Sequence, residues 1–331
     1  MRDDPDKVLE IFLSFWISRT VMAAVEMGVF EELHERTGTV KDVQSRLGIE
    51  ERPARALLDT CVSVGLLERD EEGYKNSSLG DAFLWSDSEY SLRNYVLDER
   101  WCWNAWERLE EGLRTNAQTT PPDATGYHQF PEDFFLDFLH GHSLAMGERM
   151  GLVTDITGVK KIMDVGGGSG AVSIALCRRN QNLQSVVVDQ APVVTKAAQH
   201  IERAGLSDRI ATHAANVFED VLPAGCDGAV IANFFHDFSP ERNRLVLQRV
   251  YQALPPGGRV FLLEIVPDDD RTGPPLAVVF SAAMIVNTAA GDAYTAAEYR
   301  AWLEEAGFTD VHVTSTQGRM VTAVIEAHKP S

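Results

Sequence analysis

The segment 162–170, IMDVGGGSG, places four glycines within five positions directly after an apolar run. Glycine loses more backbone entropy on folding than any other residue, so this density needs a reason. The pattern predicts a buried strand, a tight turn and the start of a helix. Gly166, Gly168 and Gly170 would then let a ligand approach bare backbone amides at the helix N-terminus.

Asp189 adds a second signal, because G-x-G-x-G alone is common in tight turns. It ends the next apolar run, VVVDQ, nineteen residues after Gly170. A carboxylate at that position accepts hydrogen bonds from the ribose hydroxyls of a nucleoside cofactor. A dinucleotide would favour the wider G-x-G-x-x-G spacing, so the sequence favours a single nucleoside.

His236 is the candidate acid–base group. It stands at the end of the fourth predicted strand, Asp237 follows it, and Glu264 lies near the end of the fifth. Carboxyl ends of parallel strands share one edge of a sheet, so we expect these residues near the glycine turn. An imidazole there can take a proton from a hydroxyl group. The alternative is a histidine that only caps the strand or the following helix.

From residue 161 onward, apolar strands alternate with helices, which predicts an open parallel sheet covered on both faces. Helix starts are expected after Ser239 and at Thr295, and a helix stop at Gly307. The final two strands, 311–316 and 322–329, are joined by a short turn, so the last strand should run antiparallel. The five preceding strands are predicted at 161–166, 185–190, 210–216, 228–235 and 259–266.

The first hundred residues are predicted to be mostly helical. Two short helices at about 40–47 and 51–64 precede a hairpin of strands 66–69 and 74–76, an order typical of a winged helix. Its second helix carries two arginines among three acidic residues, which does not give the basic stripe that phosphate contact needs. The N-terminal helix has an apolar stripe, so we expect it to pack on a second subunit. The stripe contains Leu9, Phe12, Leu13, Trp16, Val21, Ala24 and Val25.

Residues 101–155 form a helical transition that contains a polar, proline-containing loop. The segment 130–150, FPEDFFLDFLHGHSLAMGERM, has aromatic and methionine residues on one side of a predicted helix. Core packing is the ordinary explanation for such a side. The wall of an apolar ligand pocket is the alternative.

Composition narrows the classes of partner. The 331 residues carry a net charge of −19, which disfavours nucleic acid and anionic membrane surfaces. The four cysteines are far apart and fit reduced thiols in the cytoplasm better than a disulfide framework or zinc site. No signal peptide is visible, and no window of 18 uncharged apolar residues is present, so no membrane span is expected.

These motifs together resemble the class I S-adenosylmethionine-dependent methyltransferases, and more closely the small-molecule O-methyltransferases of plants and bacteria. The resemblance rests on DVGGGSG, VVDQAPVV, FFHDFSPER and LLEIVPDD in this order, after a winged-helix-like region. It implies a doubly wound Rossmann-like α/β sheet with the last strand antiparallel. It also implies a dimerisation domain at 1–100 and a catalytic domain at 101–331, in which 101–155 contributes to the acceptor pocket.

The resemblance also implies that S-adenosylmethionine lies on the glycine turn, is held through its ribose by Asp189, and leaves as S-adenosylhomocysteine. The segment 216–218 matches the one that contacts adenine in relatives, although Asn216 replaces an aspartate. Ala232 stands where many plant members have a lysine. The implied cofactor residues are Asp164, Gly166, Gly168, Gly170, Asp189, Gln190, Asn216, Val217, Phe218 and Asn233.

For the acceptor side, the resemblance implies His236 as the base, Glu264 as the residue that orients it, and Asp237 beside it. A second orienting glutamate of relatives is replaced by Ala293, with Asp292 next to it. The acceptor-contacting residues are expected to be Trp103, Phe134, Phe138, His142, Met146, Phe235, Phe280, Met284 and Asn287.

We therefore expect a homodimeric, cytoplasmic enzyme that methylates a hydroxyl of a small aromatic or apolar metabolite. A carbon methyltransferase acting on an acceptor such as a 2-oxo acid is the alternative within the class. A ligand-sensing winged-helix regulator, or a member that binds cofactor without transfer, is the alternative outside it. No metal is expected. His236 and Asp237 supply only two ligands, and asparagine occupies position 287, where a second histidine would help. His140 and His142 are two residues apart and point to opposite faces of a helix.

Overall fold

The structure is a computed structural model, and it describes residues 4–120, 132–316, 318 and 321–331. The side chains of residues 101, 132–136 and 138 lie outside this description. The chain forms two compact units, Met1–Trp103 and Asn104–Ser331.

The first unit is a winged-helix arrangement preceded by one long helix. The short helix α3 begins at a capping box in which the Thr39 and Asp42 side chains each bond to the other's backbone, and it ends at Gly48 in the left-handed conformation. The strands β1 and β2 pair antiparallel, as predicted. The elements are α1 (Pro5–Glu26), α2 (Val29–Glu32), α3 (Val40–Leu47), α4 (Glu51–Ser63), β1 (Leu67–Arg69), β2 (Tyr74–Asn76), α5 (Ser78–Phe83) and α6 (Arg93–Trp101).

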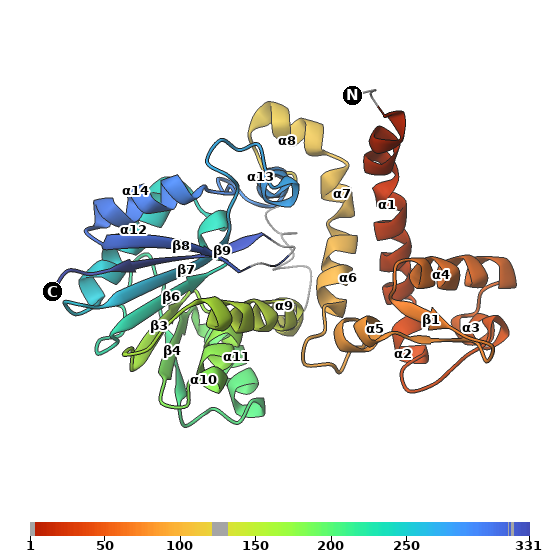
Figure 1. Ribbon diagram of the computed structural model, residues 1–331, viewed down its shortest axis with the longest axis horizontal. Coiled ribbons are helices and arrows are strands. Elements are labelled where there is room, and N and C mark those ends of the chain that lie inside the picture. Colours follow the sequence, from red (N-terminus) through yellow and green to blue (C-terminus); the bar gives the residue numbers. More distant parts are fainter. Residues whose placement is uncertain (1–3, 121–131, 317, 319–320) are drawn as a thin grey trace. The chain divides into compact units, whose positions relative to one another are not determined.

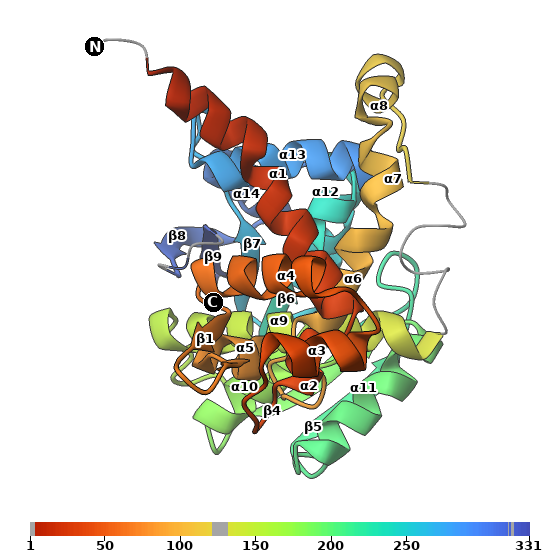
Figure 2. The ribbon, with the colours of Figure 1, turned by 90° about the vertical axis from the view of Figure 1, so that its right-hand side faces the viewer.

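Helix α1 is apolar and mostly exposed within its own unit. Its C-terminal end is anchored by Ala24 and Val25, which are fully buried, while its N-terminal half extends past α3 and α4 (Figure 2). Phe12 is 75% exposed and Trp16 is 58% exposed. By length and composition alone, α1 is the one helix in the described part of the chain that could cross a membrane. A single such helix near the N-terminus is weak evidence of a membrane span.

The second unit is built on a seven-stranded sheet in the order β5-β4-β3-β6-β7-β9-β8. Strand β9 pairs antiparallel with β7 and with β8, while the pairs from β5 to β7 are parallel. The antiparallel final strand confirms the predicted fold class. The strands are β3 (Lys161–Val165), β4 (Gln184–Asp189), β5 (Ile210–Ala214), β6 (Gly228–Ala232), β7 (Arg259–Ile265), β8 (Thr309–Ser315) and β9 (Thr322–His328).

Helices cover both faces of this sheet, as Figure 1 shows, with α9, α10 and α11 on one face and α12 and α14 on the other. The predicted N-cap residues Ser239 and Thr295 begin α12 and α14, and Gly307 ends α14. The helices are α7 (Trp103–Trp106), α8 (Leu109–Thr115), α9 (Glu132–Val153), α10 (Ala171–Arg179), α11 (Ala191–Arg203), α12 (Pro240–Ala253), α13 (Pro275–Asn287) and α14 (Ala296–Ala306).

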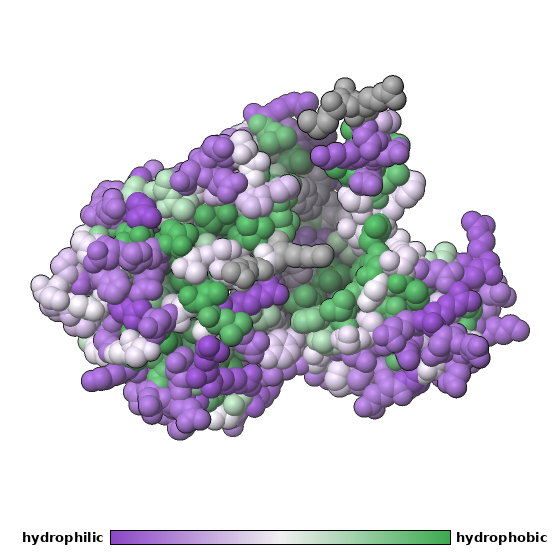
Figure 3. All heavy atoms as spheres, viewed as in Figure 1, coloured by the Kyte–Doolittle hydropathy of each residue, from purple (hydrophilic) through white to green (hydrophobic). Residues whose placement is uncertain are grey.

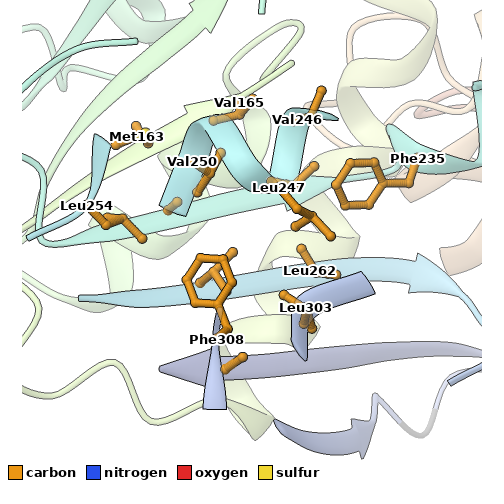
Figure 4. Packing of buried hydrophobic residues seen from close by; sticks show 14 of the residues in the cluster. Met163, Val165, Phe235, Val246, Leu247, Val250, Leu254, Leu262, Leu303 and Phe308 are labelled. Atoms are coloured by element: carbon orange, nitrogen blue, oxygen red, sulfur yellow. The ribbon is translucent and has the colours of Figure 1, made fainter. Parts of the chain in front are cut away.

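Under α12 and α14, the apolar side chains of the central strands form one core (Figure 4). Leu262 of β7 packs there with Leu247 of α12 and Leu303 of α14. Hydrophilic residues cover much of the outer surface of this unit in the face that Figure 3 shows. The buried strands thus provide a rigid frame, and the loops at their carboxyl ends are left to bind ligands.

Candidate active site

His236 and Glu264 meet at the carboxyl edge of the sheet. The Nδ1 atom of His236 lies 2.7 Å from Oε2 of Glu264, whose side chain is fully buried near the end of β7. The other oxygen of Glu264 accepts hydrogen bonds from the backbone amides of Phe234 and Phe235, at 2.9 and 2.8 Å. Glu264 therefore fixes both the imidazole ring and the backbone that carries it.

The backbone around His236 differs from the sequence expectation. Strand β6 ends at Ala232, and Phe235–Asp237 form a short 3₁₀ helix, so His236 does not end the strand. Asn233 has a positive φ of 50°, which turns the chain out of the sheet at this point. Non-glycine residues adopt this conformation at a cost, and such residues concentrate at functional sites.

The electrostatics of this pair favour a protonated imidazole. Burial by itself lowers the pKa of His236, but the carboxylates of Glu264 and Asp237 outweigh it and raise that pKa to about 9. Oδ1 of Asp237 lies 3.8 Å from Nε2 of His236. Burial also raises the pKa of Asp237. The imidazole of His236 is therefore mostly protonated at neutral pH.

The glycine turn joins β3 to α10 with positive φ at Gly166, Gly168 and Gly170. A Cβ on Gly166 would lie 2.3 Å from the Phe234 ring, so this glycine is needed for packing. A Cβ on Gly168 would meet no described atom within 4 Å, so this glycine faces open space. Gly168 thus has room for a ligand against its backbone, which fits a cofactor held at this turn.

Asp189 closes the turn from β4. Its Oδ2 accepts a hydrogen bond of 3.0 Å from the Gly168 amide, and its Oδ1 accepts one of 2.7 Å from the Gln190 amide. Burial raises the pKa of Asp189. The carboxylate therefore stands beside the open face of the glycine turn.

Asp164 lies beneath the turn and is 1% exposed. Its Oδ2 accepts a hydrogen bond of 2.6 Å from Ser173, which also bonds Ser185 at 2.7 Å. Its Oδ1 has no hydrogen-bond partner in the described part of the chain. Burial raises the pKa of Asp164 to about 6. An orphaned, buried carboxylate oxygen under a bare glycine turn is consistent with a polar ligand at this site.

The segment 216–218 forms a turn after β5. The Asn216 side chain accepts a hydrogen bond from the Phe218 amide at 3.0 Å, while Val217 is buried in the core. The Phe218 ring packs edge to face with Phe238 at 4.9 Å between ring centres. The Arg242 guanidinium lies over the Phe218 ring at 3.8 Å. Phe218 is therefore held on two sides.

Of the expected acceptor residues, Phe280 contacts the acid–base pair with its ring, which lies 5.0 Å from that of His236 in an edge-to-face arrangement. The sulfur of Met146 accepts a hydrogen bond of 3.3 Å from the side-chain Nδ2 of Asn233. Asn287 accepts one from Thr120 at 3.0 Å. Thus residues from α9 and α13 approach the carboxyl edge beside His236.

The remaining expected residues differ in their placement. Burial lowers the pKa of His142 to about 4, and Met284 is 5% exposed. Trp103 belongs to the first unit, and the side chains of Phe134 and Phe138 lie outside the described residues.

Phe235 is not an acceptor contact, and the expectation for it is wrong. Its side chain is fully buried in the core, and Figure 4 shows it pointing toward Leu247 of α12. The 3₁₀ turn breaks the alternation of a strand, so Phe234 packs on Gly166 while Phe235 enters the core. The role of Phe234 was missed, although the dense run NFFHDF was a signal for it.

Asp292 does not replace the missing second glutamate. Its carboxylate pairs with Arg271 at 3.4 Å and accepts a bond from the Ala293 amide. Ala293 is fully buried. Among the described residues, Glu264 is the carboxylate bonded to His236, and Asp237 is the second one nearby.

No group of three histidine, cysteine or acidic side chains that could hold a metal ion occurs among residues 4–120, 132–316, 318 and 321–331.

Comparison with known families bears on this geometry. A family model described as the O-methyltransferase domain matches residues 124–309. A second, described as the O-methyltransferase dimerisation domain, matches residues 9–86. This chain belongs to the O-methyltransferase family.

Individual relatives agree with the assignment. The 3-hydroxy-5-methyl-1-naphthoate 3-O-methyltransferase of Streptomyces sahachiroi is 36% identical over 313 residues, covering 93% of this chain and 90% of that protein. The acetylserotonin O-methyltransferase of Bos taurus is 33% identical over 321 residues, covering 92% of both chains. The crystal structure of human N-acetylserotonin methyltransferase with S-adenosylmethionine superposes with a TM-score of 0.88 at 26% identity, covering 100% of this chain and 99% of the other.

This O-methyltransferase therefore depends on S-adenosylmethionine as a family property.

Proposed function

We propose that this O-methyltransferase methylates a hydroxyl group of a small aromatic metabolite, with His236 taking the proton of that hydroxyl. The observation that carries the proposal is the buried His236–Glu264 pair, placed at the same sheet edge as the open glycine turn. The names of the naphthoate and acetylserotonin relatives support an aromatic, fused-ring acceptor.

The cofactor is proposed to lie on the glycine turn. Gly168 leaves its backbone open, and Asp189 offers a carboxylate for the ribose hydroxyls. Gln190 begins α11 beside Asp189, and Asn216 shapes the turn that carries Phe218. When bound, S-adenosylmethionine supplies a sulfonium-activated methyl group, so the protein needs mainly to align the acceptor with it.

The His236 side chain is proposed to act through Nε2, because Nδ1 is engaged by Glu264. The Glu264 carboxylate stabilises the imidazolium that forms when the acceptor loses its proton. General-base assistance of this kind is worth about 10²–10⁴-fold in rate. The Phe280 ring, edge-on to His236, provides an apolar surface against which a planar acceptor can lie.

Helix α1 is proposed to be the dimer contact. The dimerisation-domain match begins at residue 9, within the exposed apolar half of this helix. An exposed apolar surface of this size is normally covered by a partner. Burial of this apolar surface in a homodimer accounts for its composition without a membrane. A cytoplasmic location is part of the proposal.

The test is to incubate the enzyme with S-adenosylmethionine and a panel of hydroxylated naphthoates, indoles and phenols. Mass spectrometry should find an acceptor that gains one CH₂ unit, and a ¹³C-methyl donor should place the label on oxygen in the NMR spectrum. Label on carbon would assign the enzyme to the carbon-methylating alternative. Cofactor binding without product across the panel would contradict the proposed acceptor class.

The role of His236 is tested separately with His236→Ala. Turnover should fall by about 10²–10⁴-fold while the affinity for S-adenosylhomocysteine stays within twofold of wild type. Equal turnover in the variant would remove His236 from the mechanism and leave alignment alone as the source of the rate.

A further inference from the structure

His140 of α9 contacts the glycine turn, although the reaction chemistry does not use it. Its Nδ1 lies 2.9 Å from Oγ of Ser169. Ser169 stands between Gly168 and Gly170 and is 5% exposed. The contact therefore connects α9 to the centre of the proposed cofactor turn.

A second layer of residues holds the His140 ring from behind. The ring stacks on His200 of α11, with ring centres 3.9 Å apart and an angle of 14° between the planes. Nε2 of His200 lies 2.9 Å from Oδ1 of Asp137. The other carboxylate oxygen of Asp137, Oδ2, lies 3.6 Å from the Lys196 ammonium. Asp137 is one helical turn before His140 on α9, so α9 and α11 hold the ring between them.

The protonation state of His140 suits a hydrogen bond to a hydroxyl. Burial, followed by the charge of His200, lowers the pKa of His140 to about 3, so its imidazole is neutral at physiological pH. A neutral imidazole and a hydroxyl can each donate or accept, so the bond to Ser169 forms without placing a charge beside the turn. His140 itself then adds no positive charge beside the turn.

We propose that His140 is a positioning residue that couples the cofactor turn to α9. Through Ser169 it holds Gly168 and Gly170 in their left-handed conformations, and a ligand on the turn in return stabilises α9 around His140. Helix α9 also carries His142 and Met146, which are expected acceptor contacts. Cofactor binding would thus prepare the acceptor side. The inference rests on the proposed function, because it requires the cofactor to occupy this turn.

The coupling can be measured because it is reciprocal. If an ordered α9 increases the affinity for the ligand, binding of the ligand must also order α9. S-adenosylhomocysteine is the probe, because it binds without turnover. In wild type, its addition should slow hydrogen exchange of the backbone amides at residues 137–146. In His140→Ala, this protection should be lost, and the dissociation constant measured by calorimetry should rise about tenfold.

Three further variants separate coupling from simple loss of packing. Ser169→Ala should give the same tenfold loss, and the double variant should lose little more, because both changes remove one bond. His140→Asn places an amide near the position of Nδ1 and should recover part of the affinity and the exchange protection. His213→Ala, a change to another histidine on β5, should leave both quantities at the wild-type value.

The outcomes distinguish the inference from the function beneath it. If wild type does not bind S-adenosylhomocysteine, the proposed function fails. If wild type binds and His140→Ala binds equally well with the same protection of α9, the inference fails while the function stands. Fully additive losses in the double variant, with a matching fall in melting temperature, would reduce His140 to a packing residue and also overturn the coupling.

Discussion

Glu264 holds His236 from one side only. One carboxylate oxygen lies 2.7 Å from Nδ1 of the imidazole, and the other bonds the two amides that precede the histidine. The position where relatives have a second glutamate is Ala293, and its neighbour Asp292 pairs with Arg271. One buried carboxylate therefore sets the orientation of the ring and contributes most to its charge.

The pH dependence of the reaction should report this pair. Because the pKa of His236 is raised to about 9, the imidazolium dominates at neutral pH, and the basic form appears as the pH increases. The value of kcat/KM should therefore rise with pH and level off above about 9. Measurement between pH 6 and 10 with a fixed acceptor tests this, and a flat profile would argue against His236 as the base.

Glu264→Gln should move that profile. Loss of the carboxylate removes the charge that raises the pKa of His236, so the midpoint should shift to lower pH. The plateau rate should also fall, because the imidazolium formed during proton transfer loses its partner. Asp237→Asn provides the comparison and should shift the midpoint by less, since Asp237 lies 3.8 Å from the ring without a bond. Equal shifts in both variants would contradict the assigned roles.

Gly168→Ala should separate ligand binding from folding. The glycine has φ of 54° with open space at its Cβ position, so alanine costs about 1–2 kcal/mol of stability through the backbone. Its methyl group would occupy the face proposed for the cofactor, so affinity for S-adenosylhomocysteine should fall at least tenfold.

Gly225→Ala is the matched control. This glycine has φ of 78°, equally open space among the described atoms, and a position before the amino end of β6, away from the glycine turn. It should show a similar stability loss with wild-type affinity. If both variants bind the ligand normally, the cofactor does not lie on the Gly168 backbone.

Asp164 should make stability depend on pH. Its pKa is raised from 3.8 to about 6 in the folded chain, so folding favours the protonated form, and ionisation destabilises the fold as the pH rises through this interval. Asp164→Asn lacks this titration. The difference in the free energy of unfolding, variant minus wild type, should increase by about 1–3 kcal/mol from pH 4 to pH 7. Urea unfolding at the two pH values measures it, and a pH-independent difference would contradict the burial argument.

Local signals allowed much of the fold to be predicted. Helices α3, α12 and α14 begin at Thr39, Ser239 and Thr295 because a side chain or a following proline fixes the first turn without help from distant segments. The meeting of His236 with Glu264 was also predictable, because parallel strands bring their carboxyl ends to one edge.

The features that were missed depend on contacts across the fold. The chain leaves strand geometry at Asn233, so Phe234 and Phe235 do not take the alternating faces of the predicted strand. The bond from His140 to Ser169 joins a helix to a turn in a different element, and no periodicity encodes it. Spacing alone indicated only that His140 and His142 point in different directions.

Charge on the exposed half of α1 should separate the subunits. Phe12 and Trp16 are largely exposed within their own unit, so the double variant Phe12→Glu/Trp16→Glu should leave the fold intact and remove apolar contact area. Light scattering should give the mass of a dimer for wild type and of a monomer for the variant. Val221→Glu changes an apolar residue that is 86% exposed in the second unit, and it should remain dimeric.

Wild type should also stay unbound when floated with vesicles of phosphatidylcholine and phosphatidylglycerol. Flotation of wild type that the double variant loses would instead assign α1 to a membrane surface, and a dimeric double variant would move the subunit contact elsewhere.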